Sequence, residues 1–196
     1  GVVTNNDDPD NLGRVKVKFP WLDGDIESTW ARVVGLGAGD QRGFYCLPEV
    51  NDEVLVIFEQ GDIARPVVIG GLWNGVDAPP ANVSDVVVDG NVVQRLFVTR
   101  AGHRILFSDE NSALIRVQSA GGHELLIDDD DEKIEIKTSG GNTVSLDDNG
   151  NTLEIKGTGQ ISIEASQDLE VKSQGNMNLE ASGNMTIKGA IIQLNP

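Results

Sequence analysis

The chain has 196 residues, with 31 Asp and Glu against 15 Lys and Arg, so its formal net charge is −16 and its pI is about 4.3. This charge argues against nucleic acid as a partner, because phosphate backbones are bound by clustered Lys and Arg. The sequence contains neither an apolar run near the roughly 20 residues of a membrane helix nor a signal peptide pattern. We therefore expect a soluble acidic protein. Because the first residue is Gly1, we also expect a piece of a longer or processed polypeptide.

The first 75 residues carry short apolar runs that are typical of β-strands. Residues 15–19 alternate between apolar and polar. Residues 30–36 form one run that is apolar apart from Arg32, residues 54–58 are continuously apolar, and residues 67–69 follow a proline. Turn-forming Gly and Asp clusters separate these runs. The pattern predicts about five strands in a small closed barrel or sandwich. The single cysteine, Cys46, excludes an internal disulfide, and its apolar neighbours predict a buried thiol.

Composition changes sharply in the middle of the chain. All nine aromatic residues, five Phe, three Trp and one Tyr, lie before residue 108. The segment Ala78-Pro79-Pro80-Ala81 marks a joint, because a Pro pair interrupts strand pairing and stiffens a connection. We predict a barrel domain at residues 1–75, a linker or neck at 76–100, and a repetitive domain at 101–196.

Beyond residue 100, pairs of apolar residues with one polar residue between them recur along the chain. From Ile105 to Leu153 the step between pairs is 9 or 10 residues, and from Leu153 to Met185 it is 8. Such a repeat indicates a stack of short strands. Residues 121–129 also match residues 140–148, and Asn149-Gly150 is a hairpin signal, so the early repeats form either coil corners or antiparallel hairpins.

A step of eight leaves about five residues for a strand and three for a corner, which is too few for one chain to close a coil. Three chains, at 24 residues per coil, enclose a triangular core whose strands all have neighbours. We therefore expect an all-β protein in which a small barrel or sandwich precedes an intertwined trimeric β-helix. The alternative is a single-chain β-meander. The predicted trimer core consists of Leu153, Ile155, Ile161, Ile163, Leu169, Val171, Met177, Leu179, Met185 and Ile187.

Candidate catalytic and metal sites are weak in this sequence. The acidic run at residues 128–132 lies between strand pairs and is typical of a solvated spacer. His103 and His123 occupy equivalent places in the repeat, and Asn142 takes that place in the next copy. This exchange favours a turn residue over a metal ligand. We expect no catalytic site, no metal and no cofactor.

Several blocks of the sequence resemble the spike proteins of contractile injection systems, namely phage baseplate protein V and VgrG-type proteins. These blocks appear in the order of the family's OB-fold barrel and of its transition into the β-helix. The blocks are residues 1–21, 30–33, 47–56, 58–62, 65–75 and 99–103. The resemblance therefore implies a small OB-type barrel followed by the trimeric β-helix.

The resemblance implies a structural, non-enzymatic spike in a type VI secretion system, a phage tail or a phage-tail-like particle. Such a spike caps the inner tube, moves ahead of it when the sheath contracts, and presents its tip to a PAAR-repeat protein. The implied partners are further copies of the chain in a homotrimer, the PAAR-repeat tip protein, tail tube and baseplate hub proteins, effector cargo and the target cell envelope. Assembly in the bacterial cytoplasm, followed by secretion on firing, is also implied.

The C-terminal segment ends in an apolar stretch that would leave an open strand edge at the end of a β-helix. We predict that it docks the tip protein. The predicted docking residues are Ile191, Ile192, Gln193, Leu194, Asn195 and Pro196. Hub domains that usually precede the barrel in this family are not among these residues. The alternative function is a trimeric adhesin or tail-fibre shaft with a ligand-binding barrel.

Overall fold

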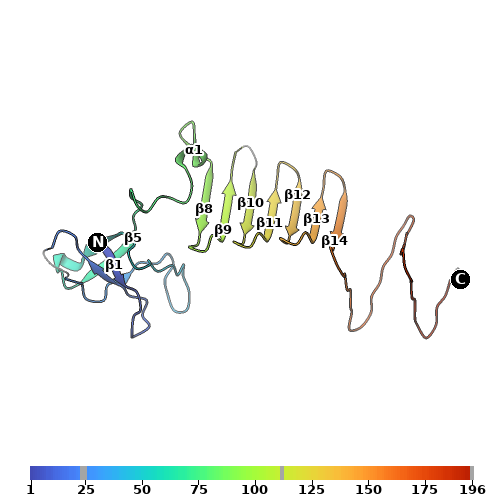
Figure 1. Ribbon diagram of the computed structural model, residues 1–196, viewed down its shortest axis with the longest axis horizontal. Helices are drawn as coiled ribbons and strands as arrows, with labels where there is room; N and C mark the ends of the chain where they lie inside the picture. Colours follow the sequence, from blue (N-terminus) through green and yellow to red (C-terminus); the bar gives the residue numbers. More distant parts are fainter. Residues whose placement is uncertain (23–25, 111–112, 195–196) are drawn as a thin grey trace.

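The computed structural model describes residues 1–22, 26–110 and 113–194, and it is all-β with almost no helix. A small barrel at the N-terminal end, a sheet in the middle and an extended C-terminal segment follow one another along the long axis (Figure 1). The helical elements are a 3-10 turn at Glu59–Gly61 and α1 at Val83–Val86. Neither of these described helices is long enough to cross a membrane.

Five short strands form the barrel. They are β1 (Val2–Asn5), β2 (Lys16–Lys18), β3 (Arg32–Val33), β4 (Val54–Phe58) and β5 (Pro66–Gly71). The β1–β2 and β4–β5 pairs are antiparallel, whereas β3 lies parallel to β5. The expected run at residues 30–36 thus contributes a strand of two residues.

Backbone hydrogen bonds between the two sheets close the barrel. The Val3 N–H donates to the Asp52 carbonyl at 3.0 Å, which joins β1 to the start of β4. Val15 and Ala31 exchange two backbone hydrogen bonds, which join β2 to β3. Apolar side chains from every strand then meet inside, since alternate residues of a strand face the same side. The buried core consists of Val3, Val15, Val17, Phe19, Ala31, Val54 and Val68.

Cys46 is exposed, so the prediction of a buried thiol is wrong. The Gly-rich loop before it forms a small hairpin, in which the Gly39 and Arg42 backbones bond to each other. Phe44 and Tyr45 beside the cysteine are also exposed. The apolar neighbours that suggested burial therefore lie on the barrel surface, outside its core.

A short neck connects the barrel to the central sheet. It contains α1 and the two-residue strands β6 (Val87–Val88) and β7 (Asn91–Val92), which pair with each other. Val93 is buried there, with 6% of its surface exposed, and its N–H donates to the Val86 carbonyl.

The central sheet is a seven-stranded antiparallel meander in which each strand pairs with the next one along the chain. The early repeats are therefore hairpins and not coil corners. Its strands are β8 (Gln94–Val98), β9 (Arg104–Ser108), β10 (Leu114–Gln118), β11 (Glu124–Asp128), β12 (Lys133–Lys137), β13 (Thr143–Asp147) and β14 (Thr152–Lys156).

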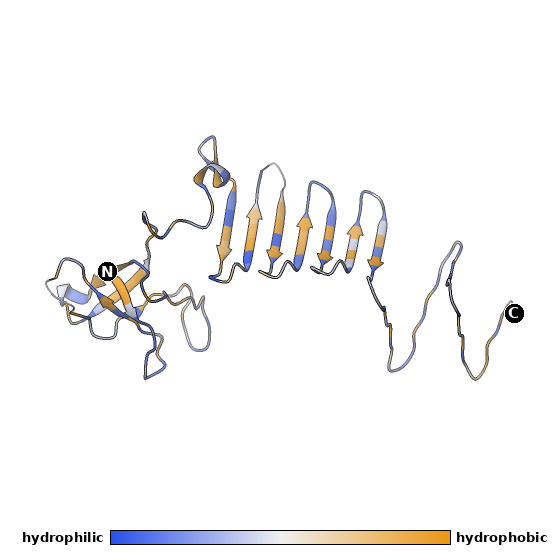
Figure 2. Ribbon diagram, in the orientation of Figure 1, coloured by the Kyte–Doolittle hydropathy of each residue, from blue (hydrophilic) through white to orange (hydrophobic). Residues whose placement is uncertain are grey.

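Residues 157–194 follow β14 as an extended segment with no strand or helix, and every one of these residues is exposed. Figure 2 shows that apolar stretches continue along this segment beyond the sheet. The eight-residue repeat thus lies in the part of the chain that makes no sheet with itself.

Candidate assembly surface

The register of the meander aligns two rows of apolar residues on one face. Because each hairpin keeps the same pairing, the apolar residues of neighbouring strands stand opposite one another and form two continuous rows. At about 4.8 Å per strand, the six steps make a face about 29 Å long. The first row is Phe107, Ile115, Ile127, Ile134, Leu146 and Leu153, and the second is Phe97, Ile105, Val117, Leu125, Ile136, Val144 and Ile155.

This apolar face is open to solvent. Ile105 is 37% exposed, Ile136 51% and Leu153 68%. Monomeric soluble proteins rarely expose a contiguous apolar patch larger than a few hundred Å². The surface of the whole chain is also large: 15,400 Å² is accessible, against about 9,000 Å² for a compact monomer of 21.0 kDa. The chain thus exposes much more surface than a compact monomer of its mass.

The residues predicted as a trimer core divide between the sheet and the extended segment. Leu153 and Ile155 end the two apolar rows on β14. The eight others, from Ile161 to Ile187, lie in the extended segment. Their exposed fractions run from 48% for Met177 to 72% for Ile163 and Leu179. A single chain therefore does not bring these eight residues together.

The residues predicted to dock a tip protein lie at the C-terminal end of the same segment. Ile191, Ile192 and Leu194 are 80%, 50% and 82% exposed, and Gln193 is exposed between them. Asn195 and Pro196 lie outside the described residues. The described part of this end is thus an apolar surface available for contact.

The opposite face of the sheet becomes charged towards its far end. Across neighbouring strands, Lys133 stands opposite both Asp128 and Asp147, and Glu124 stands opposite Lys137. Opposite charges in cross-strand positions stabilise a sheet modestly. The Lys133 ammonium also lies 2.7 Å from a Glu135 carboxylate oxygen, and this hydrogen bond raises the pKa of Lys133. One face is therefore apolar along its length, whereas the other carries leucines near the barrel and charged residues at its far end.

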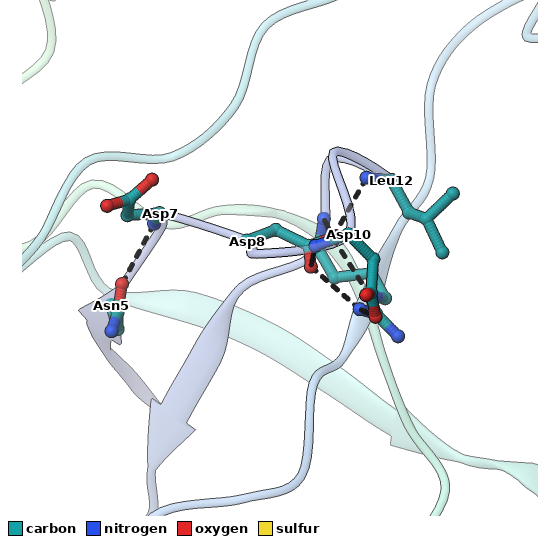
Figure 3. A network of polar contacts seen from close by, with 6 residues as sticks. Asn5, Asp7, Asp8, Asp10 and Leu12 are labelled. Carbon is teal, nitrogen blue, oxygen red and sulfur yellow. Dashed lines mark hydrogen bonds and ion pairs between the residues drawn. The ribbon is translucent and has the colours of Figure 1, made fainter.

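A buried carboxylate organises the loop between β1 and β2 of the barrel. The Asp8 side chain is 3% exposed and accepts backbone N–H bonds from Asp10, Leu12 and Arg14 at 3.0–3.1 Å. The Arg14 guanidinium donates to both Asp8 carboxylate oxygens, at 2.9 and 2.7 Å. Figure 3 shows the bonds converging on Asp8, while Asp7 points away from them.

These contacts stabilise the ionised form of Asp8. The hydrogen bonds from Arg14, followed by those from the loop amides, hold the pKa of the Asp8 carboxyl well below its ordinary range. Sequence reasoning missed this anchor. An Asp followed by Pro and Asp, with Arg six residues after the first Asp, is a signal for a loop closed by one carboxylate.

The barrel and the sheet touch through two contacts that the sequence did not reveal. The rings of Phe44 and Phe97 meet edge to face, with their centroids 5.4 Å apart. The Arg100 guanidinium lies 2.7 Å from a Glu49 carboxylate oxygen. Because Phe97 begins the second apolar row, the open face of the sheet reaches the barrel at Phe44.

Both histidines lie in the turns of the sheet, as their equivalent places in the repeat predict. His103 lies between β8 and β9, and His123 between β10 and β11. Within the part of the chain that the structure describes, no group of three or more His, Cys, Asp or Glu residues is placed to hold a metal ion.

Comparison with known proteins places the barrel in a family. The model of the "Type VI secretion system/phage-baseplate injector OB domain" family matches residues 1–73. A type VI secretion system spike protein of Vibrio cholerae, VgrG3, is 38% identical over 80 residues, which are 39% of this chain and 8% of VgrG3. The spike protein VgrG1a of Pseudomonas aeruginosa is 36% identical over 75 residues, which are 36% of this chain and 12% of VgrG1a.

A third relative, the actin cross-linking toxin VgrG1 of Vibrio cholerae, is 39% identical over 75 residues, 36% of this chain and 7% of the toxin. The matched region thus spans about a tenth of the length of these relatives. The matches confirm the resemblance drawn from the sequence. Residues 1–73 therefore form an injector OB domain of the type VI secretion and phage-baseplate family, which makes this chain a relative of VgrG-type baseplate spikes.

Proposed function

We propose that this chain is one subunit of a homotrimeric spike at the tip of a contractile injection apparatus. Two observations together carry this proposal. The sheet has an open apolar face, and the eight-residue repeats (octads) in residues 157–194 are exposed. In the trimer, each copy covers these apolar surfaces of the other two. The barrel supplies the link to the baseplate, as its family membership suggests.

In this proposal the central sheet and the extended segment assemble differently. Each seven-stranded meander forms one wall of a prism and turns its two apolar rows towards the axis. The extended segments that follow β14 then intertwine, with one strand from each chain per coil. Within a single chain these segments have no strand to pair with. Three chains held in this way cannot separate one at a time, and such a shaft resists compression when the sheath contracts.

The proposed role is structural and not enzymatic. The spike assembles with tail tube and baseplate hub proteins in the bacterial cytoplasm and leaves the cell when the apparatus fires. It carries a PAAR-repeat tip protein, and effector cargo with it, through the target cell envelope. The net negative charge of each chain, −16, keeps the prism from adhering to other anionic surfaces.

Tip docking is tested by a chain that ends at Ala190. We expect this truncated chain to lose affinity for a PAAR-repeat protein by at least about tenfold, because its exposed apolar end is removed. Pull-down and titration with the PAAR-repeat protein measure this loss, with the full chain as the reference. Light scattering is the control, since the truncated chain keeps its octads and is expected to keep the mass of the full assembly. Unchanged binding by an intact assembly would contradict the docking site.

A further inference from the structure

Three turns of the same construction lie along one edge of the central sheet, the lower edge in Figure 1. They span residues 99–103, 119–123 and 138–142. In each, the first residue is Ser or Thr, and its hydroxyl accepts the N–H of the fifth residue at 3.1 Å. The fourth residue is a glycine with positive φ, 90° at Gly102, 83° at Gly122 and 87° at Gly141, which favours glycine there.

The fifth residue of each turn links it to the next turn. His103 accepts the Ala120 N–H through Nδ1 at 3.2 Å, and His123 accepts the Ser139 N–H in the same way at 3.4 Å. Asn142 accepts the Thr158 N–H through Oδ1 at 2.8 Å. The turns therefore form a relay in which a side chain of each holds the backbone of its successor.

The relay has two chemically different kinds of acceptor. An imidazole nitrogen accepts a hydrogen bond only while it is unprotonated, and imidazole ordinarily gains its proton between about pH 8 and pH 5. The amide oxygen of Asn142 accepts throughout that range. The two links nearest the barrel thus require an imidazole nitrogen without a proton, whereas the link nearest the extended segment uses an amide oxygen.

We propose that this relay is an acid-sensitive device, in which protonation of His103 and His123 releases the barrel-side turns while Asn142 continues to hold Thr158. Acid then loosens the sheet at its barrel end and leaves the start of the extended segment anchored. The inference goes beyond the proposed function and holds for one chain or for three, because both partners of every link belong to the same chain.

Charged groups on the neighbouring elements do not replace these links. Beside His103 they are Arg100, which is paired with Glu49 of the barrel, and Arg104 on β9. Beside His123 they are Glu124, which is paired with Arg116, and Lys137 across the β11–β12 pair. Residues 119–122 and 138–141, the turns that the imidazoles contact, contain no charged side chain.

Residue-resolved hydrogen exchange on the full chain tests the device. Ala120, Ser139 and Thr158 are all exposed, so slow exchange of their amides reports the relay bonds. Between about pH 8 and pH 5 we expect the protection factors of Ala120 and Ser139 to fall roughly two- to tenfold, the range of one ordinary hydrogen bond. Thr158, held by Asn142, is the internal control and keeps its protection.

The matched variant carries His103→Asn and His123→Asn, which copies the acceptor found at position 142. We expect its amides at 120 and 139 to be protected at both pH values. If the protection of wild-type Ala120 and Ser139 stays level with that of Thr158 at pH 5, the proposal is overturned. The same holds if the double variant loses protection in acid as the wild type does. Should the variant fail to fold, the wild-type comparison with Thr158 decides alone.

Discussion

Met177→Asp is expected to prevent assembly of the chain. Met177 lies in the octad segment, where the proposed trimer turns every second residue of each strand towards a dry axis. The substitution places three carboxylates together there, and each buried charge without a partner costs several kcal/mol. Because folded proteins are stable by only about 5–15 kcal/mol, three such charges exceed what the assembly can tolerate. Light scattering is expected to give the mass of a single chain, 21.0 kDa.

Asn178→Asp is the matched control for this experiment. It introduces the same charge one residue later, where the strand alternation directs the side chain outwards. We expect it to assemble like the wild type. If Met177→Asp has the same mass and thermal stability as Asn178→Asp, the inward assignment of Met177 and of the other octad residues fails.

Asp8→Asn is expected to lower the Tm of the barrel by about 5 to 10 °C at neutral pH. The amide carries no charge for Arg14, and it cannot accept as many bonds as the carboxylate that now binds three loop amides and the guanidinium. The loop joins β1 to β2, the two strands whose backbone hydrogen bonds to β4 and β3 close the barrel. A loop that is less firmly held therefore weakens this closure. Thermal unfolding followed by the signal of the barrel's tryptophans measures the effect.

The effect of Asp8→Asn depends on pH in a defined direction. The pKa of Asp8 is lowered in the folded barrel, so its stabilisation is complete above the ordinary carboxyl range, near pH 4, and is lost as the pH falls further. The Tm difference between wild type and variant should therefore shrink below about pH 4. Asp7→Asn removes the same charge from an exposed neighbour and should have little effect. Equal Tm values for the two variants at pH 7 would contradict the anchoring role of Asp8.

Sequence periodicity predicted the strands of this chain better than their connections. The apolar pairs from Ile105 to Ile155 lie on strands, because alternation along a strand is a local property. The pairs from Ile161 onwards lie in the extended segment, which has no strand. The residues between two strands decide whether they are joined by a hairpin turn or by a coil corner. Asn149-Gly150 suggested a hairpin, but the turns at residues 99–103 and 119–123 depend on a Ser or Thr hydroxyl and a later glycine, which is a weaker sequence signal.

Contacts between distant segments could not be predicted from local patterns. Phe44 and Cys46 have the same apolar surroundings in the sequence as a core strand, yet Phe44 packs against Phe97 of the sheet and Cys46 is exposed. The Asp8 anchor is local and was missed for another reason, because Arg14 was interpreted together with the following strand. Such contacts depend on how the loops fold back, which hydrophobic periodicity does not encode.

The molar mass of the full chain in solution, measured by light scattering over a range of concentrations, tests the central claim most directly. The account predicts about 63 kDa, three times the 21.0 kDa of one chain, with no dissociation on dilution. A mass of 21.0 kDa at every concentration would contradict it, because one chain would then keep its apolar face and its octads exposed to water.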